Sequence, residues 1–218
     1  MAYPCDEESG DKLALLAQIN LSQLPENNLL PRDGMLQFFI RPDIEYGLTS
    51  TSKVIYHRTV NRSIFEKEIK ELGLPGSETV EYGDFPVTGE IAMDFEKIST
   101  FMTPSDNRFD RLVREIAEEM GIELFDGTSY MSFDDEFYEE CTGHRIGGYP
   151  YFTQYDPRSE DDLVKYDFLL LQIDTDDKTD RRDKGVMWGD AGVGQFFIGS
   201  EALKAMKLDD VYYNWDCC

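Results

Sequence analysis

The sequence predicts an α+β fold that is mainly β, with two pseudo-repeated strand units and a few helices packed into one compact body. The first observation is a repeat: LLAQI at residues 15–19 recurs as LLLQI at 169–173, and LQFFI at 36–40 recurs as GQFFI at 194–198. The second is that these runs are short, apolar and bounded by turn-forming residues, which is typical of buried strands. The third is that few segments have helical periodicity.

The repeated runs keep their order and similar spacing, which favours an internal duplication over coincidence. We interpret residues 1–218 as a single domain with repeat strands at residues 13–40 and 167–198. A mixed α/β insert at residues 41–148 separates them. Each repeated strand carries a glutamine at the same point, so we expect these four side-chain amides to bond backbone groups across the sheet. They are Gln18, Gln37, Gln172 and Gln195.

Further elements are predicted between and after the repeats. Residues 53–56 and 85–95 read as strands, the second with a proline and a glycine that indicate an edge or a bulge. Short helices are expected at residues 132–140 and from residue 200 through residue 206. Residues 145–150 interrupt regular structure and are expected to join the two halves.

One longer helix has signals at both ends. Thr103 can cap it, Pro104 suits its first position, and Gly121 stops it. Between these residues, apolar side chains recur at helical spacing: Phe109, Leu112, Val113, Ile116 and Met120.

The charge of the chain restricts its partners. There are 21 Lys and Arg against 44 Asp and Glu, a formal net charge of −23. Such a field repels DNA, RNA and anionic membranes, and attracts basic proteins, cationic ligands and divalent metals. We therefore expect no nucleic-acid or membrane partner and consider a basic protein partner, although the charge could equally serve solubility alone.

Acidic residues concentrate between residues 115 and 140, where there is no Lys or Arg. We expect this stretch to form an acidic face that occludes a basic partner. The acidic face is centred on Asp134, Asp135, Glu136 and Glu139.

The predicted compartment is the cytoplasm. The amino terminus has neither the basic nor the apolar region of an export signal, and no run approaches the roughly 18 apolar residues of a membrane span. Four cysteines are too few for a disulfide scaffold, so we expect them to be reduced.

Several motifs together resemble one family. They are LAQIN at residues 16–20 through FFI at 38–40, GGYPYFTQYDPR at 147–158, MWGDAGVGQFFI at 187–198 and YYNWDCC at 212–218. On these residues the chain resembles the bacterial YwqG-like family of uncharacterised proteins, and the resemblance implies a mainly β fold with a few helices. It also implies an immunity role, because some relatives are associated with bacterial toxin cassettes. Family members carry more residues ahead of the first Tyr-Pro pair, so this chain is expected to be a shorter version.

Metal and acid–base sites have weak support. The two histidines are His57 and His144, and Cys141 lies close enough to His144 to share a site. A thiol–imidazole pair would need an orienting partner that the sequence does not identify, so a buried thiol near a loop histidine is the favoured interpretation. The other three cysteines lack zinc-ligand spacing, and residues 174–180 lack the glycine and the final glutamate of a calcium loop. We expect no metal and no cofactor.

One cluster in the second repeat is a candidate binding site. It combines polar residues with aromatic ones, so Arg158 could be an anion-recognising fork with the tryptophans as walls of a cleft. The same residues could instead form a buried network that fixes turns. The cluster is Gln154, Asp156, Arg158, Trp188, Asp190, Trp215 and Asp216.

The leading hypothesis is an acidic binding or regulatory protein of the immunity type that binds a basic partner. The alternative is a small-ligand-binding protein or an enzyme that uses a cleft around Arg158, Trp188 and Asp190. No nucleotide-binding or nucleophile-elbow motif supports a particular reaction. Whether the protein is an enzyme is left open.

Overall fold

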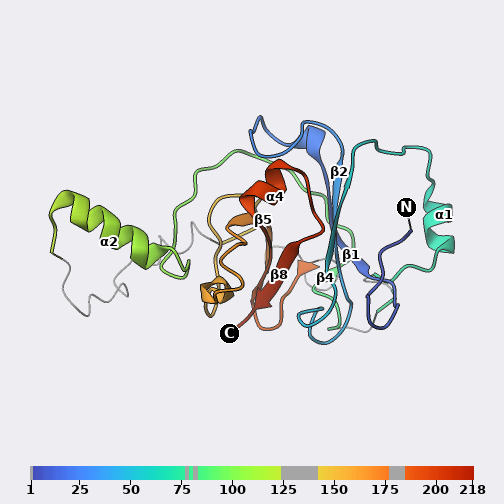
Figure 1. Ribbon diagram of the computed structural model, residues 1–218. Coiled ribbons are helices and arrows are strands. Elements are labelled where there is room, and N and C mark those ends of the chain that lie inside the picture. Colours follow the sequence, from blue (N-terminus) through green and yellow to red (C-terminus); the bar gives the residue numbers. More distant parts are fainter. Residues whose placement is uncertain (1, 77–78, 81–82, 124–141, 177–184) are drawn as a thin grey trace.

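The computed structural model describes residues 2–76, 79–80, 83–123, 142–176 and 185–218. Within them the protein is mainly β, with eight strands in three antiparallel sheets and three α-helices. Figure 1 shows the larger sheets side by side, with helix α2 projecting on one side and helix α1 beyond the other. The predicted fold class is confirmed.

Two three-stranded sheets form the body of the molecule. The first has the order β1-β2-β3 and the second the order β5-β7-β8, while a two-stranded ribbon pairs β4 with β6. The first sheet contains β1 (Ala14–Asn20), β2 (Met35–Ile40) and β3 (Lys53–His57). The second contains β5 (Phe168–Asp174), β7 (Val193–Ile198) and β8 (Val211–Asp216). The ribbon contains β4 (Val87–Thr88) and β6 (Gly185–Val186).

The first two strands of each sheet pair in the same register. In both pairs the register shifts by one residue just after the second residue of the leading strand. Beyond this shift, Gln18 lies opposite Gln37 and Gln172 lies opposite Gln195. The repeated sequence is therefore accompanied by the same pairing and the same irregularity, whereas the duplication itself stays a prediction.

A single hydrophobic core joins the inner faces of the two sheets. Phe38 and Phe196, at the same place in the two central strands, meet edge to face with ring centroids 5.1 Å apart. The Trp188 side chain is fully buried in the same core. Gly194 lies against its indole, where a Cβ would approach the ring to 2.4 Å. Apolar burial of this kind is the main stabilising term of the fold, at roughly 25 cal/mol per Å².

In the described part of the chain, three helices and two short 3₁₀ turns lie around the sheets. As predicted, α2 stops at Gly121, which adopts a left-handed conformation with φ of 66°. The short helix after β7 begins at Ser200 as predicted, and α1 was not predicted. The elements are α1 (Glu66–Glu71), α2 (Phe109–Met120), α4 (Ser200–Lys204), η1 (Leu21–Gln23) and η3 (Pro157–Ser159).

The predicted start of α2 is wrong. The helix begins at Phe109 instead of Pro104, with Arg108 as its amino-terminal cap. The Asp106 carboxylate accepts hydrogen bonds from both the backbone and the guanidinium of Arg108, and Thr103 pairs with Ser105. These local bonds favour turns over helix, because they offer the backbone alternative partners.

Two other boundaries differ from the prediction. The strand expected at residues 85–95 shrinks to Val87–Thr88, because Pro86 precedes it and Gly89 turns away with φ of 73°. Helix α4 ends before Met206, which is left-handed with φ of 51°. The Lys207 N–H then closes the helix by donating to a carbonyl of α4. The helix predicted at residues 132–140 lies outside the described residues.

Candidate functional site

Residues 142–166, which we call the strap, pair with the edge of β5 at Arg145 and then cross the outer face of the second sheet, the face turned away from the core (Figure 1). Two buried glutamines hold its middle. Gln172 Oε1 accepts the Tyr151 N–H at 2.9 Å, and Gln195 Nε2 donates to the Tyr151 carbonyl at 2.7 Å. Both members of this pair, which are 0% exposed, bond backbone groups as predicted, although these groups belong to the strap and not to a neighbouring strand of the sheet.

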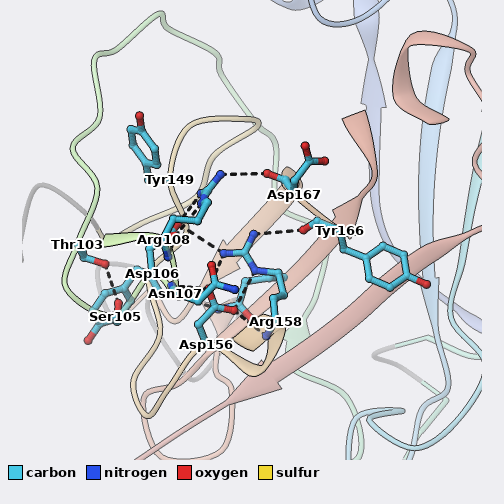
Figure 2. A network of polar contacts seen from close by, with 12 residues as sticks. Thr103, Ser105, Asp106, Asn107, Arg108, Tyr149, Asp156, Arg158, Tyr166 and Asp167 are labelled. Carbon is cyan, nitrogen blue, oxygen red and sulfur yellow. Dashed lines mark hydrogen bonds and ion pairs between the residues drawn. The ribbon is translucent and has the colours of Figure 1, made fainter. Parts of the chain in front are cut away.

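Two Asp-x-Arg units interlock between the strap and the start of α2 (Figure 2). In each unit the aspartate accepts hydrogen bonds from the N–H and the guanidinium of the arginine two residues later. Asp106 binds Arg108 in this way, and Asp156 binds Arg158. The units are cross-linked, because the Asn107 N–H donates to Asp156 at 3.0 Å and Arg158 Nη2 lies 3.5 Å from Asp106 Oδ2.

Each arginine also contacts an aromatic ring and a backbone carbonyl. The Arg158 guanidinium lies 4.3 Å from the Phe197 ring centroid, and its Nη1 donates to the Tyr166 carbonyl at 3.3 Å. The Arg108 guanidinium lies 5.6 Å from the Tyr149 ring centroid and donates to the Asp167 carbonyl at 3.2 Å (Figure 2). The Arg158 side chain is only 2% exposed, whereas that of Arg108 is 29% exposed.

The charges of this network compensate one another. Burial alone would raise the pKa of Asp106, but hydrogen bonds from Arg108 and the charges of both arginines outweigh it and lower that pKa. The pKa of Arg108 is raised, mainly by its hydrogen bonds to Asp106. Arg158 therefore meets carboxylates of its own chain, which is the arrangement expected for a buried network that fixes turns. Its role as an anion fork stays a prediction.

Gln154 and Asp216 meet where the strap crosses the end of β8. The Gln154 N–H donates to Asp216 at 2.7 Å, and the Gln154 amide donates to the Cys217 carbonyl. Asp174, at the same level of the sheet, accepts the Gly143 N–H at 2.6 Å. Burial raises the pKa of both carboxyls, and the charge of Asp174 adds to the rise at Asp216. These carboxyls therefore help to fasten the strap.

The two tryptophans lie on the other side of the second sheet. Trp188 and Trp215 stack in the core with centroids 6.2 Å apart, and Asp190 is exposed in the turn before β7. Arg158 instead packs on the outer face, so the sheet separates it from the tryptophans. The seven residues of the predicted cluster thus form separate groups, and the ligand-binding role of each stays a prediction. A groove of about 390 Å³ elsewhere on the surface is lined chiefly by residues 48–53 and 211–213.

Helix α2 carries an exposed apolar row that we call the ridge. It consists of Leu112, Ile116 and Met120, which are 39%, 45% and 67% exposed. Residues four apart lie in line along a helix, so these side chains form a continuous strip. Phe109 and Ala117, on the neighbouring line of the same helix, are buried. Figure 1 shows that the helix that carries the ridge projects from the sheets.

Acidic side chains flank the ridge. Glu115 and Glu119 each follow a ridge residue by three positions and lie along one side of the ridge at 100° per residue. On the other side, the buried line of Phe109 and Ala117 lies between the ridge and Asp110. The basic residues of the helix, Arg111 and Arg114, lie opposite the ridge, and Arg111 is 3.7 Å from Glu115. The residues predicted to centre the acidic face lie outside the described residues: Asp134, Asp135, Glu136 and Glu139.

The described residues contain no group of three or more His, Cys, Asp or Glu side chains arranged to hold a metal ion. His144 Nδ1 accepts the Asp174 N–H at 3.1 Å, and its Nε2 lies 3.7 Å from Asp176. Cys141, its predicted neighbour, lies outside the described residues. The other cysteines are free thiols: Cys5, Cys217 and Cys218.

Residues 1–217 match the family described as a domain of unknown function (DUF1963). The chain belongs to this family. No curated protein matches the sequence. Among the helices of the described residues, none combines the length and the apolar character needed to cross a lipid bilayer. The description of this family names no reaction or ligand.

Two members of the buried network were not predicted. Asp106 falls in the first turn of the helix predicted to begin at Pro104, and no role is predicted for Arg108. The signal that could have found them is the tripeptide Asp-x-Arg, present at both 106–108 and 156–158. It also occurs at 180–182, so the pattern alone does not identify which units pair.

Proposed function

We propose that the protein is a binding or regulatory protein that docks a basic, amphipathic segment of a partner protein on helix α2. The observation that carries the proposal is the ridge: Leu112, Ile116 and Met120 are exposed in one line on a projecting helix. Contiguous apolar surface rimmed by polar residues is typical of sites where proteins associate. A helix that presents such a strip fits an apolar groove or an apolar helix face.

The charges beside the ridge select the partner. Glu115 and Glu119 along one side of the ridge require basic residues beside the apolar surface that meets it. A second copy of the chain would place acidic flanks against acidic flanks, which disfavours self-association through this helix. The net charge of −23 acts in the same direction and accelerates encounter with a basic protein.

The buried network supports the helix at its base. Carboxylates hold the N–H groups of Asn107 and Arg108, the two residues just before the helix. Because Asp156 belongs to the strap and Asp106 to the start of α2, the network ties the helix to the second sheet. A fixed base reduces the entropy lost when a partner orders the surface, which raises affinity.

We further infer that the protein is YwqG-like, that its two strand units arose by duplication, and that it acts in the cytoplasm as an immunity-type protein against a basic toxin. The motif resemblance supports the first and last of these inferences. The equal register of the strand pairs supports the second. An acidic binding surface is the chemistry that would neutralise a basic partner.

Binding of a designed probe tests the role of the ridge. The probe is a fluorescent amphipathic helix of about 18 residues with leucine on one face and lysine on the other. We expect Ile116→Ser to weaken its binding by about tenfold, which corresponds to about 1.4 kcal/mol of lost apolar contact. Ile44→Ser is the control, because Ile44 is 81% exposed and lies outside the helix.

Neutralising the flanks tests the charge requirement. The pair Glu115→Gln and Glu119→Gln should slow association and flatten its dependence on salt, since exposed charges act mainly through long-range attraction. Glu26→Gln and Glu201→Gln, at side chains that are 79% and 88% exposed, form the matched control. Equal binding by ridge, flank and control variants, all folded by circular dichroism, would refute the proposal.

A further inference from the structure

The outer face of the first sheet has the strand register of the strapped face but a different environment. Gln18 and Gln37 occupy the places that Gln172 and Gln195 occupy in the second sheet. Gln18 is exposed and Gln37 is only partly buried, whereas Gln172 and Gln195 are 0% exposed. The same pair of amides thus faces solvent in one sheet and the strap in the other.

The exposed amides retain unused hydrogen-bonding capacity. Gln37 Nε2 donates to Gln18 Oε1 at 3.2 Å, and His57 Nε2 lies 2.9 Å from Gln37 Oε1. The prediction that these two glutamines bond backbone groups is therefore wrong for the first sheet. Each amide has two N–H donors and a carbonyl that accepts two bonds, so most of their capacity remains open. In the second sheet the equivalent amides bind both backbone groups of Tyr151.

One end of the open face is already covered in the manner of the strap. Tyr3 packs edge to face on Phe39, with centroids 5.8 Å apart. At the equivalent strand position of the second sheet, Phe152 of the strap packs on Phe197 at 6.0 Å. An aromatic side chain therefore closes the same corner of both faces, whereas the glutamine pair beside it is covered in the second sheet alone.

The two outer faces differ in charge at one end. Asp174 and Asp216 lie at the end of the strapped face, on either side of β7. The corresponding positions of the open face hold Asn20 and His57. A carboxylate that accepts strap N–H groups is thus replaced by a neutral or basic side chain.

The chain around β3 is a basic island in an acidic protein. Residues 46–65 contain no Asp or Glu. Arg58 and Arg62 in this stretch are exposed, and Lys53 is paired with Glu7 at 2.6 Å. At physiological salt, charges are screened beyond about 8 Å, so these nearby residues decide what the open face attracts more than the net charge does.

We propose that the outer face of the first sheet binds an extended acidic peptide of a partner protein. Gln18 and Gln37 hold the N–H and the carbonyl of one peptide residue, as Gln172 and Gln195 hold Tyr151. Arg58, which follows His57 at the end of β3 and is exposed, provides the charge that matches the acidic side chains of the peptide. The strap on the second face shows that these glutamine positions can hold an extended segment, and the exposed basic residues after β3 favour a segment that is acidic. The site is independent of helix α2.

The test uses a fluorescent peptide of about ten residues in which valine and tyrosine alternate with glutamate, a pattern that suits an extended strand. The matched control peptide has lysine in place of every glutamate. We expect the acidic peptide to bind the full chain, with amide shifts confined to β1, β2 and β3, and the lysine peptide to bind at least tenfold more weakly. Gln18→Ala combined with Gln37→Ala should weaken binding at least tenfold, and Gln23→Ala, an exposed glutamine outside the strands, should leave it unchanged.

Several results would overturn the proposal. These are no binding of the acidic peptide at millimolar concentration, equal binding of both peptides, or binding that the double glutamine variant leaves intact. Self-association that depends on Gln18 and Gln37 in the absence of peptide would make a second copy the occupant instead. The Ile116→Ser variant separates the two proposals, because it should weaken the helical probe of α2 and leave the acidic peptide bound.

Discussion

The two three-stranded sheets share strand order, pairing register and a register shift at the same place, yet their outer faces are covered to different extents. The second face is covered by the strap, which two buried glutamines, two carboxyls and Arg158 hold in place. The first face exposes the same glutamine positions. Strand pairing therefore depends on the strands themselves, whereas the burial of an outer face depends on whether another segment of the chain crosses it.

The difference has an energetic consequence. A buried polar group that loses its partner costs about 1–3 kcal/mol, and a buried charge costs more. Most polar side chains of the strapped face are buried and bond the strap, so removing their partners should carry this cost. Equivalent side chains of the open face can bond water instead, so the same substitutions should have small effects there.

The largest expected effect concerns Arg158. Arg158→Met should lower the free energy of unfolding by about 3–5 kcal/mol, because it leaves Asp156 buried without its counter-charge and removes one of the two arginines beside Asp106. Arg32→Met is the control: this arginine is 71% exposed and paired with Glu26, so a change within about 0.5 kcal/mol is expected. Urea unfolding of both variants measures the difference, and equal losses would contradict a buried network.

A smaller effect is expected when equivalent glutamines are compared. Gln172→Leu should cost about 1–3 kcal/mol, since the Tyr151 N–H and the Gly143 carbonyl both lose their partner. Gln18→Leu, at the same register in the open sheet, should change stability by less than about 0.5 kcal/mol. Similar losses in the two variants, measured by urea unfolding, would show that the outer faces are equally covered.

A still smaller effect should appear in the pH dependence of stability. Burial raises the pKa of Asp174 and Asp216, so their charged forms penalise the folded state above their folded pKa. As pH falls from neutral through those raised values toward the unfolded value near 4, this penalty is released and stability should rise. Asp106 acts in the opposite direction: its pKa is lowered, so its contribution is lost as pH falls below the unfolded value and through its folded pKa.

The variant Asp174→Asn checks this assignment by urea titration at a series of pH values. It should flatten the rise between neutral pH and pH 4 while leaving the loss at lower pH. A rise of unchanged size would show that carboxyls outside the strapped face are responsible.

Local signals predicted the repeated strands, β3 and the end of α2, but not β6, β8 or the environments of the side chains. Strand periodicity and the glycine at residue 121 act within a few residues, so they could be read from the sequence. Gln18 and Gln172 lie in nearly identical runs, and only the position of a distant strap makes one exposed and the other buried. The pairing of Asp106 with Arg158 joins residues far apart in the chain, so it too required the fold.

The predicted binding cluster illustrates the same limit. Trp215 and Asp216 are adjacent in sequence, but neighbouring residues of a strand point to opposite faces. Asp216 therefore joins Gln154 under the strap, whereas Trp215 joins Trp188 in the core. Proximity in sequence predicts a single cleft, but side chains along a strand alternate between its two faces, so the predicted cluster is divided between the core and the strap.

Exchange of the glutamine side-chain amide protons with solvent, followed by NMR on the intact chain, is the most direct test of the difference between the two faces. Both pairs are observed in one spectrum, so stability and conditions are identical for all four residues. We expect Gln172 and Gln195 to exchange slowly, because the strap buries their amides, Gln18 to exchange at nearly the rate of free glutamine, and the partly buried Gln37 to exchange faster than either strapped glutamine. Equal protection of the two pairs would contradict an open first face and a covered second one.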